Sequence, residues 1–185
     1  MKKIFKYTLL FLVFNFINFV SADEKANIIN KLNVTNTLKF NFKQKTNQVN
    51  ESGVCYLVFP KNLKCNYNDK NQKELIINKN RLAITQKRYN KTSYYSVKNS
   101  PFIKILDKKN LVKIIEKSYM EKEKKQIQLT STDINENKII VFFDGKSFDL
   151  MGWKIKDQFN NEITFLIEIL SINEEIKLNF FKIPY

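Results

Sequence analysis

Short apolar runs separated by polar turns fill the chain from residue 38 to residue 170, and they constrain its fold more than any other feature. Within most runs apolar and polar side chains alternate, and a period of two is typical of strands in an antiparallel sheet. The runs recur about every 8–12 residues, which predicts a mainly β protein of roughly eleven strands. We expect strands at Leu38–Lys45, Val54–Phe59, Leu63–Tyr67, Glu74–Asn78, Leu82–Lys87, Ser93–Val97, Leu111–Tyr119, Lys124–Ser131, Lys138–Phe143, Ser147–Lys156 and Glu162–Leu170.

Helical signals are confined to two places. Ile28, Ile29 and Leu32 recur at helical spacing, which predicts an amphipathic helix over residues 23–34. A short helical turn is expected at residues 102–106, directly after a proline.

Several of the expected strands are apolar on both faces, as in the runs ELIIN, KIIVFF and ITFLIEIL. An antiparallel sheet can leave one face wet, but such strands need cover on both. Two architectures therefore stay open. One is a closed barrel or sandwich with a filled core, and the other is a curved sheet whose concave face lines an apolar cavity plugged by the helices.

Residues 1–22 have the parts of a secretory signal peptide. Three lysines precede an apolar run at 7–20, which is followed by Ser21 and Ala22. The run is shorter than the about 20 apolar residues of a membrane-spanning helix, and asparagines interrupt it. We therefore expect cleavage after Ala22, with an uncleaved anchor as the alternative, and a single mature domain at 23–185 outside the cytoplasm.

The two cysteines, Cys55 and Cys65, are equally distant from Pro60 at the centre of a predicted hairpin turn. Residues equally far from such a turn lie opposite one another, with Cβ atoms about 4.5–5.5 Å apart. A disulfide needs about 3.5–4.5 Å, which a non-hydrogen-bonded pair reaches with little adjustment. In an oxidising compartment this spacing predicts a cross-strand disulfide. A redox-active pair is disfavoured because active-site dithiols usually have CxxC spacing, and a metal site from two cysteines without histidine is weaker still.

The formal net charge of the chain is +14, an excess that can indicate binding to nucleic acid or to an anionic membrane surface. However, only Arg81 and Arg88 are arginines. Lysine is enriched together with asparagine and isoleucine, as an AT-rich coding sequence would produce. We therefore assign most of the charge no function and expect no nucleic-acid partner.

The sequence offers few candidate catalytic residues. The absence of histidine excludes Ser-His-Asp and Cys-His nucleophilic arrangements and imidazole metal ligands. The three glycines form no phosphate-binding loop. Acidic pairs such as Glu121 with Glu123 lie among lysines, and we interpret them as solvated surface charge. We expect neither an enzyme nor a cofactor or metal site.

Five segments, taken in order, carry a resemblance to one known family. LNVTNTLKFNFKQ has a helix end, a Thr-Leu step and a Phe-x-Gln strand, and SGVCYLVFPKNLKCNYND is a hairpin with proline at its turn. ELIINKNRLAITQK is a further hairpin, and YYSVKNSPFIKIL has a small-residue-Pro step before a short helix. LMGWKIKDQFNNEITFLIEI has Gly152, Trp153, Asp157 and Thr164 in order. The series resembles the LolA family of periplasmic outer-membrane lipoprotein carriers over essentially the whole mature chain.

The resemblance implies an unclosed antiparallel β-barrel with an α-helical lid, whose apolar cavity takes up the acyl chains of lipoproteins. It implies cargo received from an inner-membrane ABC transporter of the LolCDE type and delivered to the outer membrane, through a LolB-type receptor where one exists. We expect a monomer in the periplasm. A carrier needs no catalytic group, because its task is to keep CH₂ groups, each contributing about 0.8 kcal/mol, out of water.

Strand parity and the resemblance together indicate the residues of the cavity and of its lid. For each of them ordinary core packing is the alternative. The expected cavity residues are Phe40, Phe42, Leu57, Phe59, Ile77, Leu82, Ile84, Trp153, Ile155 and Phe165, and the expected lid residues are Ile28, Ile29, Leu32, Phe102, Ile105 and Leu106.

One departure from the family concerns Phe59, which stands where the family has an arginine before proline. That arginine is tied to lid closure and cargo release, whereas a phenylalanine enlarges the apolar lining. Two alternatives to a lipoprotein carrier therefore stay open. One is a carrier of another lipid or hydrophobic ligand with the same fold, and the other is a non-catalytic basic domain that binds anionic surfaces outside the cytoplasm.

Overall fold

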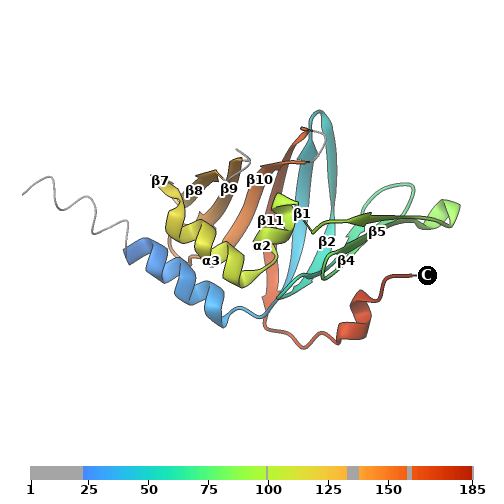
Figure 1. Cartoon of the computed structure of the whole chain (residues 1–185), viewed down its shortest axis with the longest axis horizontal. Helices are drawn as coiled ribbons and strands as arrows, with labels where there is room; N and C mark the ends of the chain where they lie inside the picture. The colour runs from blue at the N-terminus through green and yellow to red at the C-terminus, as the bar shows by residue number, and fades with distance from the viewer. Residues whose placement is uncertain (1–22, 99, 133–137, 158–159, 185) are drawn as a thin grey trace, which may run out of the picture.

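The computed structural model describes residues 23–98, 100–132, 138–157 and 160–184, so the predicted signal peptide lies outside the described residues. The described chain forms one antiparallel sheet of eleven strands with helices against it (Figure 1). The strands are β1 (Thr37–Thr46), β2 (Val49–Val58), β3 (Asn62–Tyr67), β4 (Lys73–Asn78), β5 (Arg81–Gln86), β6 (Lys91–Ser96), β7 (Tyr119–Glu123), β8 (Gln126–Thr132), β9 (Lys138–Asp144), β10 (Leu150–Lys156) and β11 (Glu162–Ile172).

The sheet is a meander that does not close on itself. Its strand order is β6-β5-β4-β3-β2-β1-β11-β10-β9-β8-β7, so neighbouring strands are consecutive in sequence except for the pair of β1 with β11. Strands β6 and β7 form its two edges. The prediction of a mainly β, unclosed antiparallel barrel is confirmed, and the alternative of a closed barrel or sandwich is wrong.

One predicted strand is also wrong, because the segment Leu111–Tyr119 mostly belongs to helix α3 (Lys108–Lys117). Its run of β-branched residues favours a strand by propensity. However, Leu111 and Ile115 are four residues apart and both fully buried, which is the helical period. Strand β7 was not predicted, since its mostly charged and exposed side chains show no apolar alternation.

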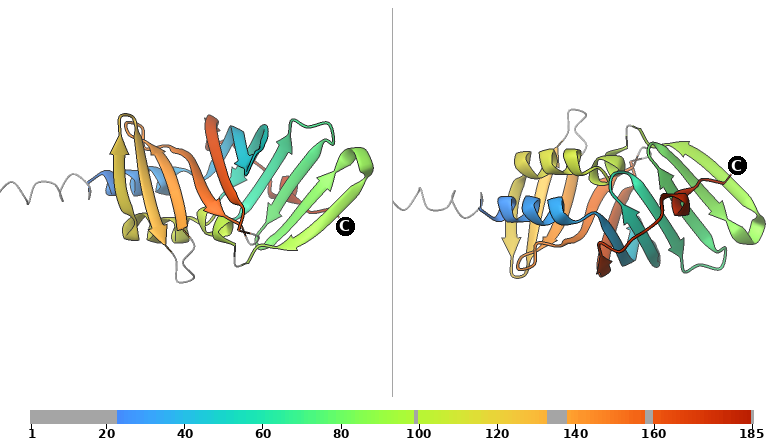
Figure 2. Two further views of the ribbon diagram at one scale, coloured as in Figure 1. Left: turned by 90° about the horizontal axis from the view of Figure 1, so that it is seen from above. Right: turned by 90° about the horizontal axis from the view of Figure 1, so that it is seen from below.

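The described α-helices lie on one side of the sheet, here called the inner face. They are the N-terminal helix (23–34), α2 (Pro101–Ile105) and α3, so the two predicted helical segments are confirmed. Figure 1 and the right-hand view of Figure 2 show the N-terminal helix and α3 side by side across the strands from β7 to β10. The hydroxyl of Ser100 caps α2 by accepting the N–H of Phe102 at 3.2 Å.

The C-terminal segment covers part of the opposite, outer face. Its short helix η2 (Leu178–Phe181) contacts β3 and β4, and Phe181 is fully buried (Figure 2, right, red). The side chain of Asn78 donates to the carbonyl oxygen of Phe181 at 3.2 Å. This cover explains why the run ELIIN is apolar at both parities, because Ile77 lies on the inner face and Ile76 on the outer face.

The predicted disulfide between Cys55 and Cys65 is present. The two residues are direct partners in the β2–β3 register, with their Cα atoms 4.1 Å apart. Both side chains are buried on the inner face. The spacing of the cysteines about Pro60 therefore predicted the geometry that joins them.

We expect the Cys55→Ala/Cys65→Ala protein to lose about 2–3 kcal/mol in free energy of unfolding, because the crosslink joins residues 10 apart and restricts the unfolded chain. Urea unfolding of the two proteins measures this difference. The native protein should also contain no thiol that reacts with an alkylating agent. Two reactive thiols in the folded native protein would contradict the disulfide.

Candidate functional site: the inner face and its lid

Four aromatic rings form a row across the inner face, from β10 to β3. Trp153 and Phe165 stack with their centroids 4.7 Å apart, and they are direct partners in the β10–β11 register. Phe165 stacks in turn on Phe42 at 4.9 Å, and Tyr67 meets Phe42 edge-on at 4.9 Å. All four are buried. The row makes the inner face one continuous apolar surface, and each aromatic pair adds about 0.5–1.5 kcal/mol beyond the burial of its area.

Gly53 of β2 allows this row to pass from β1 to β3. It is the register partner of Phe42 on one side and of Tyr67 on the other. A Cβ atom at Gly53 would lie 2.0 Å from the carbonyl oxygen of Asn66 and 2.8 Å from Cε1 of Phe42. The two rings therefore meet over a strand position that has room for no side chain.

The three helices form a lid that closes directly on the aromatic row. The ring of Phe102 in α2 lies 5.5 Å from that of Trp153. A cavity of about 20 Å³ lies between the N-terminal helix and the sheet, with Leu32, Leu38 and Phe59 among its lining residues. That volume has room for a water but is far below the about 300–1,000 Å³ of a typical ligand pocket. The lid helices therefore cover the aromatic row.

The structure brings most of the predicted site residues together. Among the predicted cavity residues, Ile84 lies apart, because it lines a separate groove on the paired strands β5 and β6. Contact of these residues with a ligand stays a prediction. Of the cavity set, Phe40, Phe42, Leu57, Ile77, Trp153, Ile155 and Phe165 are buried in the inner-face cluster, and Phe59 and Leu82 are half-buried against it. Of the lid set, Ile28, Leu32, Ile105 and Leu106 are buried in the same cluster, and Ile29 and Phe102 pack against it.

Sequence reasoning missed the part of the inner face formed by β8 and β9. Ile127 and Leu129 of β8, with Val141 and Phe143 of β9, are fully buried there. The run KIIVFF of β9 is apolar at both parities, so its pattern does not show which side chains point inward. The missing information is the register of β9 with its neighbours, which only the assembled sheet supplies.

The turn between β2 and β3 ties the lid to the sheet. The N–H of Lys61 donates to the carbonyl oxygen of Leu106 at 2.8 Å. The ammonium of Lys61 pairs with the carboxylate of Asp107 at 2.9 Å. Asp107 also caps α3 by accepting the N–H of Asn110 at 3.3 Å. The turn is therefore fixed to the junction of α2 and α3.

Phe59 lies in the same region, beneath the ammonium of Lys108. This ammonium is 5.5 Å from the centroid of the Phe59 ring. It also donates to the carbonyl oxygen of Asn33 at 3.1 Å and to Oδ1 of Asn36 at 3.0 Å, at the end of the N-terminal helix. Burial lowers the pKa of Lys108. Lys61 therefore connects the lid to the sheet, and Lys108 connects α3 to the end of the N-terminal helix above Phe59, where the family has an arginine.

We expect the contribution of Asp107 to stability to disappear in acid. Burial alone raises the pKa of this carboxyl group, but the hydrogen bonds from Lys61 and from the Asn110 N–H outweigh it and hold the pKa below its usual value of 3.8. The contribution is therefore present above about pH 4 and is lost as the pH falls through the native pKa.

The Asp107→Asn protein should accordingly be less stable than the native protein at neutral pH and nearly equal to it in strong acid. Urea unfolding at both pH values measures the two differences. The Lys61→Met protein lacks the other partner of this ion pair, so its free energy of unfolding should show the same loss of pH dependence. An equal loss of stability at both pH values would contradict this role of the charge.

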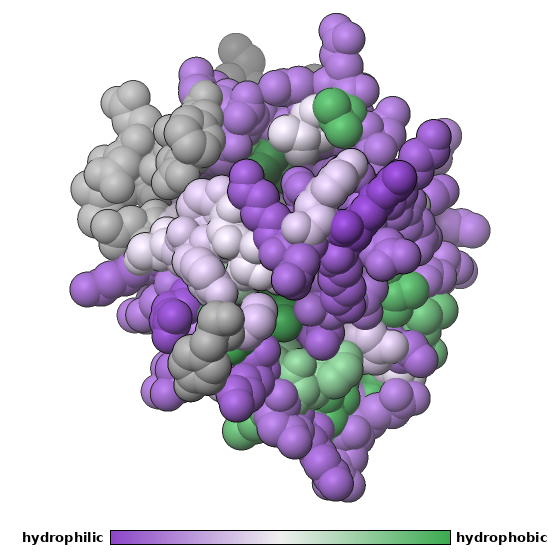
Figure 3. Space-filling view, turned by 90° about the vertical axis from the view of Figure 1, so that its right-hand side faces the viewer, coloured by the Kyte–Doolittle hydropathy of each residue, from purple (hydrophilic) through white to green (hydrophobic). Residues whose placement is uncertain are grey.

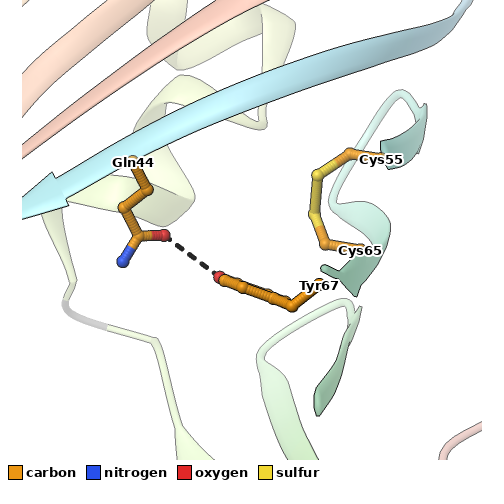
Figure 4. Close-up of a disulfide and its surroundings, with 4 residues drawn as sticks. All are labelled: Gln44, Cys55, Cys65 and Tyr67. Atoms are coloured by element: carbon orange, nitrogen blue, oxygen red, sulfur yellow. Dashed lines mark hydrogen bonds between the residues drawn. A yellow bond between two sulfur atoms is a disulfide. The ribbon is translucent and has the colours of Figure 1, made fainter. Parts of the chain in front are cut away.

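A polar network closes one end of the inner face (Figure 4). The hydroxyl of Tyr67 donates to Oε1 of Gln44 at 3.0 Å. Glu51 forms an ion pair with Lys73, whose ammonium lies 3.8 Å from the centroid of the Tyr67 ring. Burial, followed by the charges of Glu51 and Asp69, raises the pKa of Tyr67, so its hydroxyl stays protonated as a donor. The apolar surface therefore ends at a fixed polar boundary beside the disulfide.

The chemistry that the inner face offers is the burial of apolar groups. Within the described ranges, no group of three or more His, Cys, Asp or Glu side chains is placed to hold a metal ion. None of the helices in the described part of the chain is long and apolar enough to cross a membrane.

Comparison with known families decides the relationship of this chain. The sequence matches the family model described as outer membrane lipoprotein carrier protein LolA over residues 33–184. The chain belongs to the LolA family. The match covers the whole sheet with α2 and α3, so the resemblance based on five segments is confirmed. No curated protein sequence matches this LolA-family chain.

Solved structures share its fold at low sequence identity. An uncharacterized conserved protein from Thermus thermophilus has a TM-score of 0.54 and 7% identity, over 89% of this chain and 94% of that one. The lipoprotein LppX of Mycobacterium tuberculosis has a TM-score of 0.48 and 9% identity, over 86% and 98% of the two chains. A LolA-superfamily protein from Nitrosomonas europaea has a TM-score of 0.41 and 6% identity, over 84% and 96%. The first likeness concerns the fold alone, and the two weaker ones add nothing to it.

Proposed function

We propose that this LolA-family protein is a periplasmic carrier of acylated lipoproteins, whose acyl chains it holds between the lid and the inner face. The observation that carries the proposal is the single apolar cluster shared by the aromatic row and the lid helices. Removing the lid from this cluster would expose a large apolar surface, which is unfavourable in water unless another apolar group takes its place. Acyl chains are such a group.

The energetics favour exchange of the lid for a ligand. Each CH₂ group of an acyl chain gains about 0.8 kcal/mol when it leaves water, and three chains hold dozens of such groups. The ion pairs that tie the lid to the sheet join Lys61 to Asp107, Lys31 to Asp149 and Lys122 to Glu24. Such partly exposed pairs contribute only about 0–1 kcal/mol each. The apolar contacts, which the cargo can replace, therefore set most of the free energy of opening.

The connections of the lid are compatible with such movement. Residues 35–36 join the N-terminal helix to β1, and α2 and α3 lie together between β6 and β7 in the chain. In the described part of the chain, the backbone hydrogen bond from Lys61 of the β2–β3 turn to Leu106 joins the sheet to the junction of the two later helices. The lid can therefore lift from the aromatic row while every strand pairing is kept.

The proposed role includes partners and a compartment. Cargo would come from an inner-membrane transporter of the LolCDE type and pass to the outer membrane, through a LolB-type receptor where one exists. The mature monomer, residues 23–185, would act in the periplasm after removal of its signal peptide, as a carrier and not as an enzyme. A carrier of another lipid is the second candidate, because the half-buried Phe59 gives an apolar lining where the family has arginine.

A release assay tests the proposal. Cells that export the full chain supply the mature protein, which is added to energised spheroplasts of the source bacterium. We expect triacylated lipoproteins to appear in the supernatant in a soluble complex with the protein. If none appear while a standard LolA releases them in parallel, lipoproteins are not the cargo. Lipid analysis of the material that co-purifies with the protein then tests the second candidate.

A further inference from the structure

Positive charge is concentrated at one end of the sheet. The segment from 79 to 98, here called the basic hairpin, contains β5, the short helix η1 (Lys87–Tyr89) and β6. No acidic residue occurs anywhere between positions 75 and 106, although the chain has 18 Asp and Glu residues. A general enrichment in lysine does not produce such an acid-free stretch with both arginines of the chain. The basic hairpin has six exposed basic residues, Lys79, Arg81, Lys87, Arg88, Lys91 and Lys98.

These charges remain largely uncompensated by neighbouring strands. Glu74 of β4 pairs with Lys87 at 2.8 Å, but the same carboxylate also pairs with Lys64 at 3.3 Å. It therefore neutralises at most one charge of the basic hairpin. Strand β6 is an edge of the sheet, so the hairpin forms one end of the molecule (Figure 1, right). Figure 3 shows this end, where hydrophilic side chains surround a paler patch of intermediate hydropathy.

Exposed tyrosines accompany the charges. Tyr89 is 60% exposed, and Tyr94 and Tyr95 are each 48% exposed. The guanidinium of Arg88 lies 6.0 Å from the centroid of the Tyr89 ring. Tyrosine has an apolar ring and a polar hydroxyl, and it is enriched where proteins meet the headgroup region of membranes.

An open groove lies on the inner face of the basic hairpin, on β5 and β6. Its volume is about 280 Å³, and its lining includes Ile84, Ser93 and Tyr95. Ile84 and Ser93 are direct partners in the β5–β6 register, and Tyr95 is the partner of Leu82, which packs against the closed inner-face cluster. The groove therefore lies on the same face of the sheet as the covered cluster, at the edge strand β6.

We propose that the basic hairpin docks onto the surface of an anionic phospholipid bilayer and places the groove at the level of the headgroups. Three of its basic residues lie at one end of the two strands and three at the other. Six residues of strand separate these groups by about 20 Å. Such spacing suits an extended anionic surface better than a single phosphate group. Docking brings the mouth of the inner face to the membrane, where a lipid chain enters or leaves the carrier.

Binding to vesicles tests the docking site without any cargo. The mature protein, obtained from cells that export the full chain, is sedimented with vesicles of phosphatidylglycerol and phosphatidylethanolamine or of phosphatidylcholine alone. We expect binding to the anionic vesicles only, and we expect it to weaken with rising salt. The Arg81→Gln/Arg88→Gln/Lys91→Gln protein should bind on the order of 100-fold more weakly, because each basic residue at such a surface contributes about a fivefold gain in affinity.

A matched control is the Lys109→Gln/Lys113→Gln/Lys117→Gln protein, which removes the same charge from exposed positions of α3. It should keep at least most of the affinity of the native protein. Equal losses for the two variants, equal binding to neutral vesicles, or no binding to anionic vesicles would each overturn the docking site. Because the vesicles contain no lipoprotein, these outcomes are independent of the release assay. The docking site fails alone if lipoprotein release succeeds without vesicle binding.

Discussion

The Gly53→Ala protein is expected to lose at least about 4 kcal/mol in free energy of unfolding, a value that only a severe structural conflict produces. The added Cβ atom would lie 2.0 Å from the carbonyl oxygen of Asn66, which belongs to the backbone of the paired strand. It would also lie 2.8 Å from the ring of Phe42. Neither group can move away cheaply, since the first is fixed in the sheet and the second is stacked in the aromatic row.

Gly145→Ala supplies the control for this prediction. A Cβ atom at Gly145 meets its nearest neighbour, the carbonyl oxygen of Lys125, at 3.1 Å. We expect this variant to lose less than about 2 kcal/mol, within the range of most single substitutions. Thermal and urea unfolding followed by circular dichroism compare the two variants. A Gly53→Ala protein of native stability would show that the aromatic row does not cross β2 as described.

The Phe165→Ala protein is expected to lose about 3–5 kcal/mol, which is typical of removing a buried phenylalanine. Its ring is stacked on Trp153 on one side and on Phe42 on the other, so the substitution leaves a hole in the middle of the row. Leu166→Ala is the matched control, because this neighbour points to the outer face and is 46% exposed. We expect the control to lose less than about 1 kcal/mol.

The same pair of variants separates a carrier from a protein with an ordinary filled core. If acyl chains occupy the inner face, acylated cargo should restore part of the stability that Phe165→Ala removes, because the chains fill the space left by the ring. Unfolding is therefore measured with and without an acylated lipopeptide. We expect the acylated lipopeptide to stabilise Phe165→Ala by more than it stabilises Leu166→Ala, and the unacylated peptide to stabilise neither. Equal stability with both peptides would contradict the presence of acyl chains at Phe165.

Much of the sheet could be predicted because its residues carry the pattern themselves. Phe40 and Phe42 share a parity in β1, and both are buried on the inner face as expected. The disulfide could be predicted because one local symmetry, about Pro60, fixes which residues are opposite. In both cases the decisive information lies within a few neighbouring residues.

Other features depend on contacts between distant segments and have no local signal. The pattern of the segment at Leu111 predicts a strand, because its β-branched residues mask a helical period that only the burial of the side chains shows. The contacts of Lys61 with Asp107, and of Lys108 with Asn36, join parts of the chain that are far apart in sequence. The departure at Phe59 could be seen in the sequence, but the lysines that connect the lid in its place could not.

The central proposal, that acyl chains lie between the lid and the aromatic row, can be measured through Trp153. This side chain is the only tryptophan of the protein, it is buried, and it contacts both Phe165 of the row and Phe102 of the lid. The mature protein is titrated with a triacylated lipopeptide that carries bromine atoms on its acyl chains, and tryptophan fluorescence is recorded. We expect saturable quenching by the brominated lipopeptide and none by the same lipopeptide without bromine. Tight binding of the brominated lipopeptide without quenching of Trp153 would contradict the proposed location of the acyl chains.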